Sequence, residues 1–140
     1  MKLLRIGVDA LDYVEAISEA GSLLVNAGLT EERYTSAMIR VVDELGPYMV
    51  LADQVALAHA RPTDGVLENG ISLALLSKTI DFAGKPVRAV FALAATNHDA
   101  HLENLSALAD ALADERTRNL LLTALELEQI PTVFKAILGE

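Results

Sequence analysis

The chain has 140 residues, of which 52% are hydrophobic, and its formal net charge is -9 at pH 7. This length is typical of a single domain, and the apolar content excludes a disordered chain, which would lack the area needed to offset its ordering entropy. The acidic balance, with 11 basic residues in all, argues against nucleic acid as a partner, because phosphate backbones require clustered lysine and arginine. The absence of cysteine excludes disulfides and thiolate metal sites.

Neither a signal peptide nor a membrane span is expected. Residues 1–7 carry positive charge but no apolar stretch of the length that a signal peptide requires, and acidic residues follow at once. The longest nearly uninterrupted apolar run, residues 87–95, is far shorter than the roughly 18 residues needed to cross a bilayer. We therefore expect a cytoplasmic protein that does not insert directly into a membrane.

Two amphipathic helices are predicted in the first third of the chain. From about Asp12, apolar residues recur at spacings of three and four, and Gly28 is the predicted end of this helix. Thr30 is the predicted N-cap of the second helix, because two glutamates and another apolar stripe follow it. The pair Gly46-Pro47 ends this helix, since glycine permits a left-handed cap and proline cannot continue the hydrogen-bond ladder.

The middle of the chain consists of short apolar runs separated by turn residues, a pattern typical of strands. The predicted strands cover residues 48–51, 55–58, 71–76 and 87–95. After residue 97 the helical spacing of leucines returns and continues to the end of the chain. Helices, then strands, then helices predict an α/β fold: a single domain over residues 1–140, built as an α/β/α sandwich with a small mixed sheet flanked by helices on both faces.

Three histidines are the candidates for chemistry. His59 directly follows the predicted strand 55–58, a position where a rigid scaffold can present one reactive side chain. His98 and His101 lie at the start of a predicted helix, and their spacing of three places them near one another on its first turn. Alone, this pattern also fits structural histidines or a metal site. With no His-Glu-x-x-His motif and only three imidazoles, we predict no metal site.

Four segments carry a more specific pattern: residues 34–40, residues 44–50 with Gly-Pro-Tyr, residues 55–62 with His-Ala-Arg-Pro, and residues 94–105 around the second and third histidines. Together they resemble the mannitol/fructose-type IIA family of the bacterial sugar phosphotransferase system. The separation of Gly-Pro-Tyr from His-Ala-Arg-Pro is most similar to the ascorbate branch of that family. The resemblance covers almost the whole chain and agrees with the predicted order of helices and strands.

The resemblance implies a role for individual residues. The family's phosphorylated histidine falls on His59, and its second active-site histidine falls on His101 rather than on His98. Arg61 belongs to the motif of the ascorbate branch and is implied as a phosphate contact.

The chain also departs from the family at two places. Ala58 stands before the histidine, where the family commonly has proline. Mannitol-type members carry an active-site arginine in the second helix, whereas this chain has valine at positions 41 and 42 and its arginine displaced to Arg40. We therefore expect Arg61 to supply the positive charge instead.

The resemblance further implies a phosphotransferase that accepts a phosphoryl group from phospho-HPr and hands it to a IIB component, and through it serves a membrane IIC component, during uptake of ascorbate or a similar sugar or polyol. Transfer between histidines requires no metal or organic cofactor. Three alternatives stay open: a regulatory IIA-type protein that acts through its phosphorylation state, a metal-dependent hydrolase built on the three histidines, and an interaction domain without chemistry.

Overall fold

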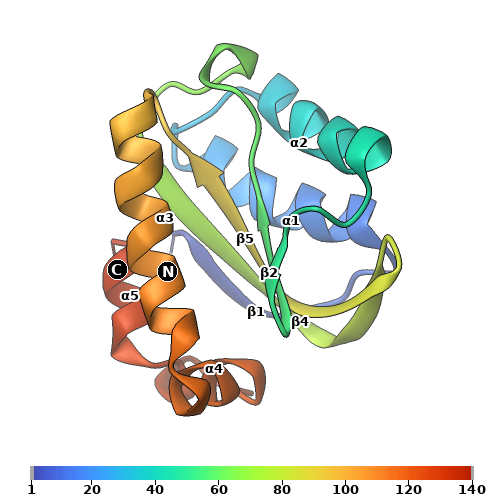
Figure 1. The fold of residues 1–140 in the computed structure, drawn as a ribbon, viewed down its shortest axis with the longest axis vertical. Coiled ribbons are helices and arrows are strands. Elements are labelled where there is room, and N and C mark those ends of the chain that lie inside the picture. The colour runs from blue at the N-terminus through green and yellow to red at the C-terminus, as the bar shows by residue number, and fades with distance from the viewer. Residues whose placement is uncertain (1, 140) are drawn as a thin grey trace.

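A five-stranded mixed sheet lies between two helical layers in the computed structural model, which describes residues 2–139 (Figure 1). The strands are β1 (Leu4–Val8), β2 (Val50–Ala52), β3 (Gln54–Ala58), β4 (Gly70–Phe82) and β5 (Lys85–Ala94), and their spatial order is β1-β4-β5-β3-β2. The β1–β4 and β3–β5 pairs are parallel, whereas β4–β5 and β2–β3 are antiparallel. The predicted α/β class with a mixed sheet is confirmed.

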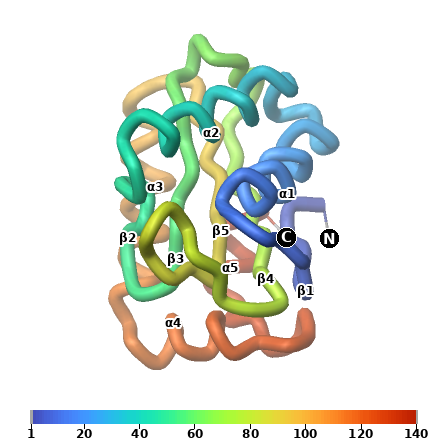
Figure 2. Tube along the Cα trace, turned by 90° about the vertical axis from the view of Figure 1, so that its right-hand side faces the viewer, coloured from blue at the N-terminus to red at the C-terminus, as the bar shows by residue number. Residues whose placement is uncertain are grey.

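Helices cover both faces of the sheet, as predicted (Figure 2). One face carries α1 (Tyr13–Asn26) and α2 (Glu32–Leu45), and the other carries α3 (His98–Ala113), α4 (Glu115–Leu122) and α5 (Thr132–Ile137). Each face has its own cluster of buried apolar side chains, to which the central strands contribute alternate residues. This double burial explains why β3, β4 and β5 read as continuous apolar runs rather than alternating ones.

The two N-terminal helices follow their sequence signals with one exception. Asp12 caps α1 by accepting a hydrogen bond from the Glu15 backbone amide at 3.0 Å, and Gly46 ends α2 with φ 75°. The predicted N-cap of α2 is wrong: this position is occupied by Glu31, without a side-chain cap. Thr30 is instead buried and paired with Val66 in an isolated β-bridge. This pairing holds Thr30 outside the helix, so Thr30 does not cap α2.

The strands differ from the predicted ranges mainly at the edges. The first predicted strand, residues 48–51, is shifted, because β2 begins at Val50 and Tyr48 is exposed. β4 continues beyond residue 76 to Phe82, where it turns into β5. β1 was not predicted at all. Within residues 2–139, none of the helices combines the length and the apolar character that crossing a bilayer would require.

Candidate active site

The three histidines meet at one edge of the sheet. His59 directly follows β3, and α3 begins at His98 shortly after β5. β3 and β5 are parallel neighbours whose pairing ends at Ala58 opposite Ala92, so both strands deliver the chain that follows them to the same edge. This topology brings together residues that are about forty positions apart in the sequence (Figure 1).

His59 and His101 form a pair. Their ring centroids are 5.5 Å apart and the rings are tilted by 58°. Both side chains are half-buried, whereas His98 is exposed. All three line a cavity of about 360 Å³. The structure thus places His98 at the mouth of the same cavity, but only His101 packs against the ring of His59.

The His59 ring is oriented by a backbone carbonyl of β3, the strand that precedes it. Nδ1 lies 3.2 Å from the carbonyl oxygen of Leu57. A carbonyl can only accept a hydrogen bond, so Nδ1 must carry the proton, and in the neutral ring Nε2 then holds the free lone pair. Nε2 is therefore the ring nitrogen of His59 that is available to form a new bond.

His101 lies in an environment that disfavours its charged form. Partial burial lowers its pKa from the ordinary 6.5, and nearby His59 and His98 lower that pKa further because a second positive charge beside them is unfavourable. Both effects favour the neutral form of the His101 ring.

The start of α3 is held rigidly beside the cavity. The Asn97 side chain caps α3 by accepting a hydrogen bond from the Ala100 backbone amide at 2.9 Å. Asn69 fixes the preceding residue by accepting a hydrogen bond from the Thr96 backbone amide at 2.7 Å. The positive end of this 16-residue helix thus points into the region of the histidine pair, where it favours an anion.

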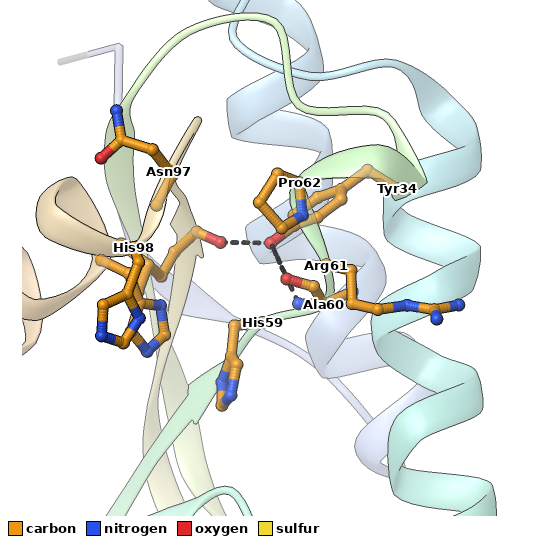
Figure 3. Close-up of a pocket in the computed structure, with 10 residues that line it drawn as sticks. Tyr34, His59, Ala60, Arg61, Pro62, Asn97 and His98 are labelled. Carbon is orange, nitrogen blue, oxygen red and sulfur yellow. Dashed lines mark hydrogen bonds between the residues drawn. The ribbon is translucent and has the colours of Figure 1, made fainter.

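Arg61 is close to His59 in sequence, but its side chain extends toward α2, away from the histidine rings (Figure 3). Its backbone amide donates to an Asp64 carboxylate oxygen at 3.1 Å, and its Nε lies 3.5 Å from the same atom. Asp64 closes the short 3-10 helix Pro62–Asp64. The backbone of Arg61 is therefore fixed, while its side chain is 83% exposed and, within residues 2–139, held only by this surface ion pair with Asp64.

A second cavity, of about 490 Å³, lies on the α2 side of His59. Its lining includes His59, Arg61 and Asp64, together with the exposed Arg40 of α2. In the sequence, Arg40 is displaced from the family position, and Arg61 is expected to supply the positive charge in its place. The structure shows that its side chain borders the segment containing His59, a placement that helical spacing alone does not reveal. Tyr34, which from sequence belongs to the apolar stripe of α2 and to the segment 34–40 that resembles the family, also lines the histidine cavity.

A metal ion would need several histidine, aspartate or glutamate side chains gathered around one point. Within residues 2–139 they form no group of three or more that is arranged to hold a metal ion. The groups that line the two cavities include imidazole rings, residues at the start of α3 and the side chains of Arg40 and Arg61.

Two solved structures of phosphotransferase IIA proteins have the same fold. The solution structure of a mannitol-specific cryptic phosphotransferase enzyme IIA from Escherichia coli superimposes with a TM-score of 0.88 at 31% identity, covering 97% of this chain and 94% of that one. A complex of mannitol enzyme IIA with phosphorylated mannitol enzyme IIB, also from Escherichia coli, gives a TM-score of 0.83 at 25% identity, covering 96% and 95% of the two chains.

Proteins related in sequence belong to the same class as these solved structures. The mannitol-specific cryptic phosphotransferase enzyme IIA component of Escherichia coli strain K12 is 34% identical over 126 residues, which are 89% of this chain and 86% of that protein. The ascorbate-specific EIIA component of the same strain is 35% identical over 105 residues, which are 73% and 68% of the two chains. The family model described as phosphoenolpyruvate-dependent sugar phosphotransferase system, EIIA 2, matches residues 1–137. The chain therefore belongs to the type 2 EIIA family of the sugar phosphotransferase system.

Proposed function

We propose that this chain is a histidine phosphocarrier that accepts a phosphoryl group on Nε2 of His59 from phospho-HPr and passes it to a IIB component, during uptake of ascorbate or a similar sugar or polyol. One observation carries the proposal: the Leu57 carbonyl holds the proton of His59 on Nδ1, so that Nε2 is a free nucleophile in a cavity shared with His101. The relatives support the substrate class, because they include mannitol and ascorbate components. A IIB acceptor is supported by the structural neighbour in which mannitol IIA is bound to phosphorylated IIB.

The transfer step is an in-line displacement at phosphorus. The lone pair on Nε2 of His59 forms a new N–P bond while the donor's N–P bond breaks, and the donor ring keeps that electron pair. The His59 ring gains positive charge in this step. The hydrogen bond from Nδ1 to the Leu57 carbonyl stabilises that charge, since a charged donor makes a stronger bond than a neutral one.

His101 and the start of α3 stabilise the phosphoryl oxygens. The neutral His101 ring can donate one N–H to an oxygen beside His59, and the negative charge of the phosphoryl group favours protonation of His101 against the burial that lowers its pKa. Backbone amides in the first turn of α3 face the same region with the positive end of the helix dipole. The site is thus electrostatically matched to a phosphoryl group rather than to a neutral ligand.

Arg61 contributes a further positive charge once its exposed side chain turns toward His59. We expect Arg61→Ala to slow phosphorylation of the chain by phospho-HPr about tenfold, because one electrostatic partner of the transferred group is lost. Arg61→Lys should recover part of the rate, since lysine keeps the charge but not the planar fork of donors. The measurement is the rate of labelling in rapid-quench experiments.

Arg116→Ala is the matched control for this series, because Arg116 is exposed on α4, which lies away from the histidine cavity. It should leave the rate within about twofold of the unmodified chain, as is usual for a surface substitution. If Arg40→Ala were slow and Arg61→Ala were not, the positive charge would come from α2 and the role of Arg61 would be wrong.

The function is tested by reconstitution. The chain is mixed with phosphoenolpyruvate, enzyme I and HPr, and its intact mass should show one acid-labile phosphoryl group. Adding ascorbate-type or mannitol-type IIB should then discharge it, and the faster acceptor identifies the transport system. Failure to acquire the group would overturn the proposal, and retention of the group with every IIB would favour the regulatory alternative.

A further inference from the structure

The hydroxyl of Tyr34 lies at the point where the strands beside His59 separate. The ring is buried in the cluster beneath α1 and α2, with 1% of the residue exposed. The hydroxyl accepts a hydrogen bond from the Ala60 backbone amide at 3.0 Å and donates one to the Leu93 carbonyl at 2.6 Å (Figure 3). The Ala60 carbonyl, at 3.4 Å, is a more distant contact.

If the β3–β5 pairing continued by one more step, a hydrogen bond would join the Ala60 amide to the Leu93 carbonyl. The parallel pairing ends with Ala58 opposite Ala92, so a continued register would place Ala60 opposite Ala94. The slanted hydrogen bonds of a parallel pair would then link the Ala60 amide to the carbonyl of Leu93. In the structure, the tyrosine oxygen is inserted between that donor and that acceptor. The strands therefore open at His59 without leaving either polar group unsatisfied.

The insertion fixes the backbone of His59 from both sides. Ala58 is held by the last rung of the ladder, and Ala60 is held by Tyr34. Because the residues before and after it are anchored, His59 has little freedom to move its Cα or to tilt its ring away from the Leu57 carbonyl. Burial of the phenol raises the pKa of Tyr34 to about 12, so its hydroxyl remains a donor at every pH at which the chain is active.

The helix that carries Tyr34 is itself held against the loop after His59. Arg33 donates a hydrogen bond to the Thr63 carbonyl at 3.0 Å. Gly65 follows with φ 127°, and a Cβ at that position would lie 3.3 Å from the Cβ of Tyr34. Glycine therefore allows both the backbone conformation and the close approach. The tyrosine oxygen is thus placed by α2 as a rigid element and not by a flexible side chain.

We propose that Tyr34 is a positioning residue for phosphoryl transfer, acting through the Ala60 backbone to hold His59 in its reactive orientation; this rests on the function proposed above for His59. Removing only the hydroxyl should leave the packing of the ring intact while releasing Ala60. If the His59 ring is displaced by a fraction of an ångström, the chain still binds phospho-HPr, but the phosphoryl group is transferred more slowly.

The test compares Tyr34→Phe with Tyr13→Phe. Tyr13 is a matched control because its hydroxyl is also hydrogen-bonded, to Asp43, and its ring packs on Phe82 near the β4–β5 turn, far from His59 along the sheet. Tyr34→Phe should lower the maximal rate of phosphorylation by phospho-HPr roughly ten- to a hundredfold, with the KM for phospho-HPr within about twofold of the unmodified chain. Tyr13→Phe should change neither quantity. Equal rates for the two variants, or a raised KM alone, would overturn the proposal.

Nuclear magnetic resonance provides a readout that does not depend on phosphoryl transfer. In the unmodified chain, the Ala60 amide should be protected from hydrogen exchange to the same degree as the paired amides of β3, and the ring nitrogens of His59 should show the Nδ1–H tautomer alone. Tyr34→Phe should abolish the protection of Ala60 and give a mixture of His59 tautomers. Rapid exchange of Ala60 in the unmodified chain would by itself contradict the bridge, even if the variant failed to fold. Should the chain never accept a phosphoryl group, the proposed function fails, and these two signals still decide the role of Tyr34.

Discussion

His59→Ala is expected to abolish phosphorylation of the chain by phosphoenolpyruvate, enzyme I and HPr. The reason is chemical: the variant lacks the imidazole whose Nε2 is proposed to form the bond to phosphorus, and His101, which packs beside that ring, is expected to contact the transferred group rather than to accept it. Intact-mass spectra recorded at neutral pH should show a single acid-labile phosphoryl group on the unmodified chain and none on the variant.

The loss should not come from unfolding. His59 is half-buried at the sheet edge, and its ring is hydrogen-bonded to the carbonyl of Leu57, two residues earlier in the chain. The variant should therefore keep the circular dichroism spectrum and stay within a few degrees of the melting temperature of the unmodified chain, about the shift that a 1 kcal/mol change produces. Full labelling of a folded His59→Ala chain would show that another residue is the acceptor.

His101→Ala and His98→Ala are expected to differ strongly although both histidines lie on the first turn of α3. His101 packs against His59, and its loss removes a positioned partner of the transferred group, so the rate of transfer from phospho-HPr should fall on the order of tenfold to a thousandfold. His98 is exposed at the cavity mouth, and its replacement should change the rate by less than about threefold. The measurement is single-turnover labelling at saturating donor.

Each of these variants controls for the other, since both remove one imidazole from the same helix turn. His101→Gln is a useful third variant, because its amide can still donate a hydrogen bond and should recover part of the rate. Equal rates for the two alanine variants, or a slower His98→Ala, would mean that the second active-site histidine has been assigned to the wrong position.

The sequence predicts those parts of the fold in which local signals and tertiary structure agree. Asp12 and Gly46-Pro47 bound their helices as expected, because capping and φ preferences act within a few residues. Thr30 has an equally good capping signal, but its pairing with Val66 depends on a residue far away in the sequence. β1 was not predicted, because it has five residues and Gly7 interrupts its register with β4. Its alternation of apolar and polar residues is therefore too short to be distinguished from chance.

The candidate site was predictable in its residue types but not in its contacts. The sequence predicts that His59 lies at a strand end and that His98 and His101 lie at a helix start. Only the parallel β3–β5 pairing brings them into one cavity, and this pairing could not be predicted from local signals. The direction of the Arg61 side chain and the reach of Arg40 depend on how α2 packs on the sheet. Tyr34 begins one of the segments that carry the family resemblance, but its hydrogen bonds to the backbone beside His59 could not be predicted, because they depend on where two strands separate.

The most direct test of this account is to locate the phosphoryl group on the phosphorylated chain. Two-dimensional ¹⁵N–¹H spectra of the histidine rings, recorded before and after phosphorylation, identify both the residue and the nitrogen. We predict that His59 alone is modified, that the bond to phosphorus is at Nε2, and that Nδ1 keeps its proton, donated to the Leu57 carbonyl. Phosphorus on Nδ1 of His59, or on His98 or His101, would contradict it.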